Sequence, residues 1–337
     1  LGHGNQPWPD WQQHRRYGYG PRLVTHLNYG EGDGLSDWGV PPKGKGIRRG
    51  PQPSHPDMAS FDEDIARRIS EVLSDDHDRP LFLGAGFYRP HTPLYAPLRW
   101  MDHFNEQEVT LPKTRIDDLD DLPYFGAKPR REVDVEAPGL WNHEWVLKNE
   151  KWHSIVRAYL ASTAYVDEQI GKVIEAWKKS KQFEKTYLIL FSDHGWHLGE
   201  KEHWGKAALW EQTTRVPLII AGPGIPKGEV CSKPVELLSI YPTLLEWADV
   251  DPPHDLEGIS LTPLLADKDI DWPYPAVTTF SDHHALRTER FRYIRYEDGS
   301  EELYDHRSDP NEWTNLALKD HPELATLRKQ LTQILQP

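Results

Sequence analysis

Residues 187–200 read YLILFSDHGWHLGE, and this stretch decides the fold class. Residues 187–191 are an unbroken apolar run, the pattern of a short strand buried in a parallel sheet. An acid, an imidazole and a glycine follow this run, at Asp193, His194 and Gly195. Because ligands of open α/β sheets bind beyond the carboxyl ends of the strands, the pattern predicts that chemistry takes place here.

Two further apolar runs predict strands of the same sheet. Residues 216–221 (VPLIIA) predict the strand after 187–192, with Lys206 in the glycine-bearing loop before it. Residues 81–87 (LFLGAGF) predict another buried parallel strand, whose carboxyl end leads to Arg89 and His91. Parallel strands bring their carboxyl ends to one edge, so we expect His91 and Lys206 to converge with the Asp-His pair on one pocket.

Each of these residues has a plainer interpretation when it is taken alone. A polar Asp-His-Gly turn commonly follows a buried strand. Lys206 is equally interpreted as a solvated surface lysine, and His91 as a structural histidine bonded to a backbone carbonyl. The functional interpretation therefore depends on a longer pattern.

Periodicity and turn signals divide the chain into a larger and a smaller part. Residues 276–304 predict short antiparallel strands with an Asp-Gly hairpin turn, after an Asp- and Pro-rich stretch at 266–275. We therefore expect 1–272 to be part of a catalytic α/β domain, and 276–337 to form a small antiparallel sheet with a helix. Apolar residues at helical spacing predict helices after a capping box at 60–63, over 153–179, over about 235–247 and over about 322–335, with a surface insertion at 102–150.

The composition excludes several classes of protein. The chain of 337 residues has a formal net charge of −14, whereas a nucleic-acid-binding face must be basic, so we expect no nucleic-acid partner. Mean hydropathy is −0.71. No apolar run approaches the roughly 20 residues of a membrane helix, so we expect no membrane span. A single cysteine, Cys231, excludes an internal disulfide.

Several longer motifs occur in a fixed order along the chain. They are FYRPHTP at 87–93, SDHGWHLGE at 192–200, WGK at 204–206, RVPLI at 215–219, ELYD at 302–305 and DPNE at 309–312. Together they resemble the type I sulfatases, and more closely the iduronate-2-sulfatase-like branch, within the alkaline-phosphatase-like superfamily. The resemblance implies the alkaline-phosphatase-like/sulfatase fold: α/β, with a mixed, largely parallel sheet between helices and a small C-terminal antiparallel-sheet subdomain.

The resemblance also implies that Asp193 and His194 are metal ligands. The carboxylate of Asp193 suits calcium, which prefers oxygen ligands. An imidazole is less natural there, because it favours zinc and other transition metals. The expected cofactor is one Ca²⁺ ion, with another divalent metal as the alternative.

Hydrolysis of a sulfate ester needs fixed positive charge and a proton donor to the leaving oxygen. The resemblance implies that Lys206 contacts the sulfate group, that His91 faces the leaving oxygen, and that His3 helps to deprotonate a formylglycine hydrate. We further expect Arg89, together with Lys206, to bind the substrate. His283, before the C-terminal strands, is predicted to reach the mouth of the substrate site.

One motif of the family does not occur in this sequence. The family's nucleophile is a cysteine or serine in a C/S-x-P-x-R motif, oxidised to formylglycine, and no such motif is found here. We therefore expect this chain to lack the N-terminal, nucleophile-bearing portion of the enzyme, to be inactive alone, and to have that portion as its partner. The expected activity is hydrolysis of sulfate esters on a sulfated saccharide or glycosaminoglycan-like substrate, in the periplasm or outside the cell. The alternatives are a phosphonate monoester hydrolase or phosphodiesterase of the same superfamily, and a catalytically dead, glycan-binding pseudoenzyme.

Overall fold

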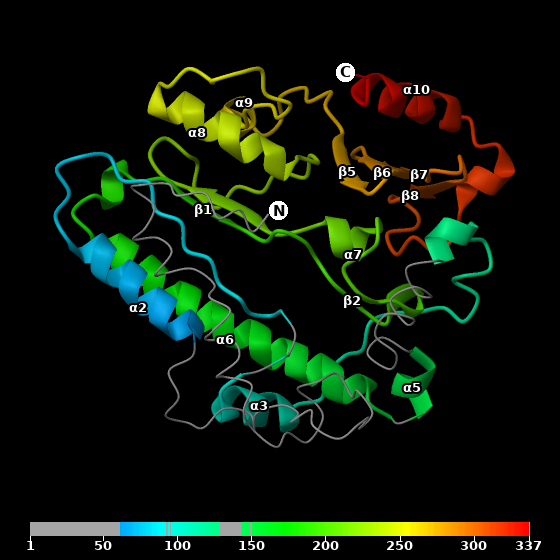
Figure 1. Cartoon of the computed structure of the whole chain (residues 1–337), viewed down its shortest axis with the longest axis horizontal. Coiled ribbons are helices and arrows are strands. Elements are labelled where there is room, and N and C mark those ends of the chain that lie inside the picture. The colour runs from blue at the N-terminus through cyan, green and yellow to red at the C-terminus, as the bar shows by residue number, and fades with distance from the viewer. Residues whose placement is uncertain (1–60, 92–93, 95, 128–142, 149, 337) are drawn as a thin grey trace. The chain divides into compact units, whose positions relative to one another are not determined.

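A computed structural model describes residues 61–91, 94, 96–127, 143–148 and 150–336 (Figure 1). The chain divides into two compact units, Leu1–Leu111 with Ala137–Lys185 and Pro112–Glu136 with Thr186–Pro337. Two predicted features, the capping box that begins at Ser60 and the catalytic His3, lie outside the described residues. No helix in the described part of the chain has the length and apolar character needed to cross a membrane.

The first unit is built on one long helix, α6 (Trp152–Lys179), which confirms the helix predicted over 153–179. Helices α2 (Phe61–Ser74) and α3 (Leu98–Asn105) both pack against α6, and Figure 1 shows α2 running alongside it. Ala161 and Tyr165 of α6 are buried together with Ala96, beside the aromatic residues of α3. The predicted surface insertion begins within α3 and contains the short helix α5 (His143–Lys148), and the turn η3 (Phe183–Lys185) follows α6.

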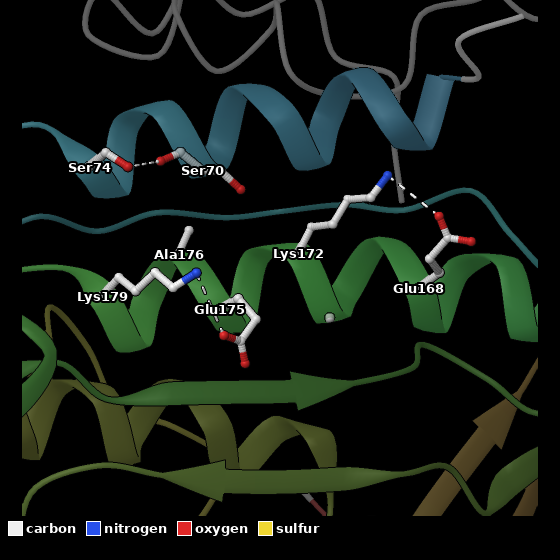
Figure 2. A pocket seen from close by; sticks show the side chains of 8 residues that line it. Ser70, Ser74, Glu168, Lys172, Glu175, Ala176 and Lys179 are labelled. Atoms are coloured by element: carbon white, nitrogen blue, oxygen red, sulfur yellow. Dashed lines mark hydrogen bonds and ion pairs between the residues drawn. The ribbon is translucent and has the colours of Figure 1, made fainter. Parts of the chain in front are cut away.

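A shallow groove of about 580 Å³ runs between α2 and α6 (Figure 2). Its charged side chains are paired with one another along α6. The amine of Lys172 lies 3.6 Å from the carboxylate of Glu168, and that of Lys179 lies 3.9 Å from Glu175. Because these charges are already compensated, nothing in the groove requires a ligand.

The prediction of a strand over residues 81–87 is wrong. These residues form irregular structure, and Leu81 and Phe82 are 46% and 62% exposed. A strand needs a neighbour to pair with, and within the part of the chain that the structure describes none pairs with 81–87. Gly84 and Gly86 also weaken the preference of this segment for a strand.

The second unit contains the pair of strands that the sequence predicted around the Asp-His-Gly turn. Strand β1 (Leu188–Phe191) pairs with β4 (Leu218–Ala221), and Phe191 lies opposite Leu218. The pairing is antiparallel, so the expectation that these two strands run parallel is wrong. A parallel pair needs a crossover that packs across the sheet. Here the connection returns the chain to the carboxyl end of β1 instead.

That connection is built from short elements. The two-residue strands β2 (His197–Leu198) and β3 (Trp204–Gly205) form a hairpin, with the turn η4 (Glu200–Glu202) between them. The single-turn helix α7 (Glu211–Thr214) follows and leads into β4. The chain then forms η5 (Leu237–Ser239), α8 (Ile240–Ala248), where a helix was predicted over 235–247, and α9 (Thr262–Ala266).

The C-terminal strands form an antiparallel sheet in sequence order, as predicted. They are β5 (Ala276–Phe280), β6 (His283–Arg287), β7 (Phe291–Arg295) and β8 (Glu301–Asp305). One cluster of sheet residues, including Leu286 and Leu303, packs against α10 (Leu324–Ile334), which confirms the terminal helix. Another cluster, including Ile294, packs against Trp210 beside α7. The domain boundary at 272–276 stays a prediction.

Residues 112–127 belong to the second unit although they are far from the rest of it in sequence. The carboxylate of Asp118 lies 2.8 Å from the amine of Lys201. The backbone N–H of Asn315 donates to the carboxylate of Asp121 at 2.7 Å. The side-chain amide of Asn315 donates to the backbone carbonyl of Asp121. The turn η6 (Leu316–Lys319) begins next to this contact, and the Asn315 side chain caps it.

Candidate active site

The predicted metal ligands lie in the turn that follows β1. The backbone N–H of His194 donates to Oδ1 of Asp193 at 3.0 Å. The ring nitrogen Nδ1 of His194 lies 2.8 Å from the carbonyl oxygen of Gly195, and a carbonyl only accepts, so Nδ1 donates. The other ring nitrogen, Nε2, lies 3.6 Å from Oδ2 of Asp193. The Asp193 side chain is 74% exposed and that of His194 is 27% exposed, so the pair faces outward.

This arrangement suits a cation. A neutral imidazole that donates through Nδ1 carries its lone pair on Nε2, and this lone pair faces a carboxylate oxygen. Two electron-rich atoms so close are stabilised by a positive charge between them, either a proton or a metal ion. One oxygen and one nitrogen are acceptable ligands for a divalent metal, but a calcium ion takes six to eight, so this turn would supply only part of the shell.

Gly195 lets this turn lie directly on α7. Its N–H donates to the carbonyl of Thr213 at 2.7 Å, and the N–H of Trp196 donates to that of Gln212 at 2.8 Å. A Cβ atom at residue 195 would lie 2.0 Å from the Gln212 oxygen, so a side chain there would force the turn and α7 to move apart. The position of the Asp-His pair is therefore set by α7.

Lys206 follows β3 and its side chain is exposed, as a residue that contacts a substrate anion must be. Gly205, before it, has φ +137°, a conformation that favours glycine. Lys201 lies in the turn of the hairpin that leads to Lys206. It is buried and adopts left-handed backbone dihedrals. The ammonium of Lys201 bonds to Asp118 and to the carbonyl oxygen of Glu312.

Arg89 and His91 lie together in the first unit. The backbone N–H of His91 donates to the Tyr88 carbonyl at 3.0 Å, and Arg89 donates from its guanidinium to the His91 carbonyl at 3.2 Å. The buried carboxylate of Asp62, in the first turn of α2, accepts from the N–H groups of Tyr88 and Arg89. Burial raises the pKa of Asp62. The His91 side chain is exposed at the end of this clamped turn.

The predicted site residues therefore form two groups, one in each unit. Asp193, His194 and Lys206 lie in the second unit, and Arg89 and His91 in the first. The convergence of all of them on one pocket stays a prediction. Its original reason, a shared edge of parallel strands, does not apply, because β1 and β4 are antiparallel and 81–87 is not a strand.

His283 lies at the start of β6, and its ring is packed among aromatic side chains. The ring centroids of Phe125 and Tyr296 lie 5.1 and 5.2 Å from that of His283. Its Nδ1 atom accepts from the backbone N–H of Glu297 at 3.2 Å. These contacts fix the orientation of the ring, and its role in binding substrate remains a prediction.

Two other histidines of the loop, His197 and His203, are residue types that can ligate a metal, but both are buried. His197 is fully buried, and its Nδ1 lies 2.7 Å from the hydroxyl of Thr213. Burial lowers the pKa of His197 well below its usual value, and lowers that of His203 to about 4. Both pack near Trp210, which agrees with a packing role in the loop.

The sequence reasoning missed a buried network of charges beneath this loop. Glu211, His306 and Glu312 place ligand atoms within 4.8 Å of one another, a spacing that suits a metal. However, the guanidinium of Arg292 bonds to both carboxylates, and that of Arg287 lies 3.0 Å from Nδ1 of His306. The group is thus compensated by two arginines. In the sequence, the sign of this network is the pair of arginines, Arg287 and Arg292, within the largely apolar strands β6 and β7.

Two family models and several curated proteins match this chain. A family model described as Sulfatase matches residues 8–250, and one described as N-sulphoglucosamine sulphohydrolase, C-terminal, matches residues 199–337. A sulfatase of Formosa agariphila is 37% identical over 301 residues, covering 89% of this chain and 56% of that protein. The N-acetylglucosamine-6-O-sulfatase of Bacteroides thetaiotaomicron is 33% identical over 201 residues, covering 55% of this chain and 36% of that protein. The chain spans about half the length of the curated relatives it matches.

Solved structures agree on the fold. The phosphonate monoester hydrolase of Silicibacter pomeroyi has a TM-score of 0.71 at 23% identity, covering 98% of this chain and 67% of that chain. A protein in complex with its substrate D-glucosamine-2-N,6-O-disulfate has a TM-score of 0.62 at 25% identity, covering 81% of this chain and 68% of that chain. The alkaline-phosphatase-like/sulfatase fold is confirmed by these likenesses. With its family model matching most of its length, this chain belongs to the sulfatase family.

Proposed function

We propose that this chain is part of a metal-dependent formylglycine sulfatase that hydrolyses sulfate esters on a sulfated saccharide or glycosaminoglycan-like substrate. The observation that carries the proposal is the Asp193–His194 pair, whose facing oxygen and nitrogen suit a divalent cation. Relatives named for sulfated sugars support the substrate class. We propose calcium as the metal and the periplasm or the cell exterior as the location.

In this proposal each residue has one task. The bound cation would offset negative charge on the sulfuryl oxygens. Lys206, exposed beyond β3, would bind the sulfate as a point charge, and Arg89 would add positive charge to an anion site on a chain whose net charge is −14. His91, at the end of its clamped turn, would donate a proton to the leaving oxygen.

We propose further that the nucleophile is supplied by residues outside this chain, which the active enzyme needs as a partner. Phe191 of β1 and Ile219 of β4 are 48% and 55% exposed. In the register of the pair they point to opposite faces of the ribbon, so both faces present apolar surface. Such surface is normally covered, which supports a further layer of protein there.

The experiment compares aryl sulfate turnover by the full-length enzyme and by this chain alone, with and without calcium. We expect calcium-stimulated turnover from the full-length enzyme only. Lys206→Met should reduce kcat/KM by at least about 100-fold, as expected when one charge-stabilising group is removed. Lys227→Met, at an exposed lysine after β4, is the matched control and should change nothing. Robust turnover by the isolated chain would overturn the external nucleophile.

The likeness to a phosphonate monoester hydrolase favours one alternative activity. The same assay with an aryl phosphodiester and an aryl phosphonate monoester in place of the sulfate separates the two. Higher kcat/KM for the phosphorus substrates would replace the sulfatase proposal. Tight binding of a sulfated glycan without any turnover by the full-length protein would instead favour the pseudoenzyme.

A further inference from the structure

Glu312 occupies an unusual position in the turn that follows β8. Its side chain is fully buried, and its backbone is left-handed at φ +58°. Its Oε1 atom accepts from Nε of Arg292 at 2.5 Å and from Nε2 of His306 at 2.8 Å. Burial alone would raise the pKa of the Glu312 carboxyl, but Arg292 and His306 outweigh it and lower the pKa to about 2. The group is thus a fixed anion.

The other carboxylate oxygen of Glu312 reaches the helix that sets the Asp-His turn. Oε2 accepts from the backbone N–H of Glu211, the first residue of α7, at 2.9 Å. The first N–H groups of a helix have no partner within it, so this bond anchors the start of α7. Two carbonyls of the same helix hold the N–H groups of Gly195 and Trp196. One carboxylate is therefore connected to the turn of the predicted metal ligands through a single helical turn.

The backbone carbonyl of Glu312 reaches the loop of the predicted sulfate-binding residue. It accepts from the ammonium of Lys201, which lies in the turn between β2 and β3. Lys206 is the residue that follows β3. The side chain and the backbone of one residue thus hold the two loops that carry the candidate chemistry.

We propose that Glu312 is a positioning residue that holds the Asp193–His194 turn and the Lys206 loop in register with each other. The assignment of a metal and a sulfate to these loops rests on the proposed function. The connection of the two loops through Glu312 rests only on the hydrogen bonds described above. Glu312 touches neither reacting group, so its effect passes through α7 and Lys201.

The test measures amide hydrogen exchange by mass spectrometry in the metal-free full-length protein, which needs no activity. Glu312→Gln and Glu312→Ala are compared with Glu301→Gln. Glu301 is the first residue of β8, and its carboxylate bonds to Arg328 of α10 and to Tyr293 instead. We expect both Glu312 variants to exchange at least about 10-fold faster in peptides covering 193–206, and by a larger factor there than in β5 to β7, where a change reports only the overall loss of stability. Glu301→Gln should leave 193–206 unchanged.

A calcium titration of the same proteins provides the second measurement. Groups that orient metal ligands typically change affinity by about 10- to 100-fold, so Glu312→Gln should weaken calcium binding at least 10-fold. Glu301→Gln should change the calcium affinity by less than about twofold. If the Glu312→Ala protein does not fold, the exchange and calcium measurements on Glu312→Gln alone test the proposal, because glutamine keeps the side-chain volume. The positioning role would be overturned if exchange over 193–206 in Glu312→Gln equalled that of the unsubstituted protein, or rose no more than exchange in β5 to β7. Faster exchange in an enzyme with no sulfatase activity would support that role and refute the proposed function alone.

Discussion

Replacing Lys201 with methionine tests the buried charge network most directly. The ion pair of Lys201 with Asp118 spans 2.8 Å, and the two side chains are only 2% and 4% exposed. Methionine retains most of the lysine stem, so the change removes charge and leaves little cavity. Asp118 then loses the cation that bonds to it and keeps only the electrostatic influence of Arg115, and the carbonyl of Glu312 loses the Lys201 donor.

The expected loss is large. Removing one partner of a buried pair costs about 3–5 kcal/mol, because the remaining charge stays desolvated. Lys201 also lies 5.3 Å from the ring centroids of Trp210 and Tyr304, so cation–π attraction is lost as well. Since a domain is stable by only about 5–15 kcal/mol, we expect the second unit to become marginal.

The assay is hydrogen exchange in peptides covering β6 to β8, whose protection reports the free energy of opening of the second unit. Lys201→Met/Asp118→Leu should recover most of the loss, because a hydrophobic pair needs no charge compensation. Burial raises the pKa of Asp118 even beside Lys201, so the defect of the single variant should also shrink at low pH, as Asp118 gains a proton. A loss below about 1 kcal/mol, or a double variant as unstable as the single one, would refute this reasoning.

Three further predictions concern the site. Asp193→Ala should leave stability within about 0.5 kcal/mol, because the side chain is 74% exposed, yet abolish calcium binding in a titration of the full-length enzyme. Gly195→Ala should cost about 2 kcal/mol in chemical denaturation, because its Cβ would meet the Gln212 carbonyl, and should weaken calcium binding too. The pKa of Glu312 falls from 4.5 unfolded to about 2 folded, so its contribution of about 3 kcal/mol is present above pH 4.5 and is lost as the pH falls toward 2. The difference in urea midpoint between the parent and Glu312→Gln should therefore narrow from pH 7 to pH 3.

Local signals predicted the elements that depend on local sequence. The helix over 153–179 follows from apolar residues at helical spacing, and α6 buries them. The C-terminal sheet follows from alternating strands and the Asp-Gly turn, where Gly299 indeed has a positive φ of 82°. The turn and the lysine at 192–206 were singled out by the resemblance of the longer pattern to a known family, because each residue taken alone has a plainer interpretation.

The failures arise from pairing partners, which local sequence does not encode. Residues 81–87 are as apolar as a buried strand, but a strand forms only where another lies beside it. The direction of β4 depends on the path of residues 192–217, whose short elements carry no strong periodicity. The charges of Arg292 and Glu302 had the signature of surface residues, and only the fold brings their partners to them.

The attachment of residues 112–127 to the second unit has a consequence for synthesis on the ribosome. The bond between Asp121 and Asn315 joins positions 194 residues apart. At about 5–20 residues per second, some 10–40 s pass between the emergence of these two positions. During that interval Asp118 and Asp121 have left the ribosome, but the groups that fix them in place have not all been made. Their segment, rich in aspartate, stays hydrated during this interval, and the second unit closes only after Asn315 has emerged.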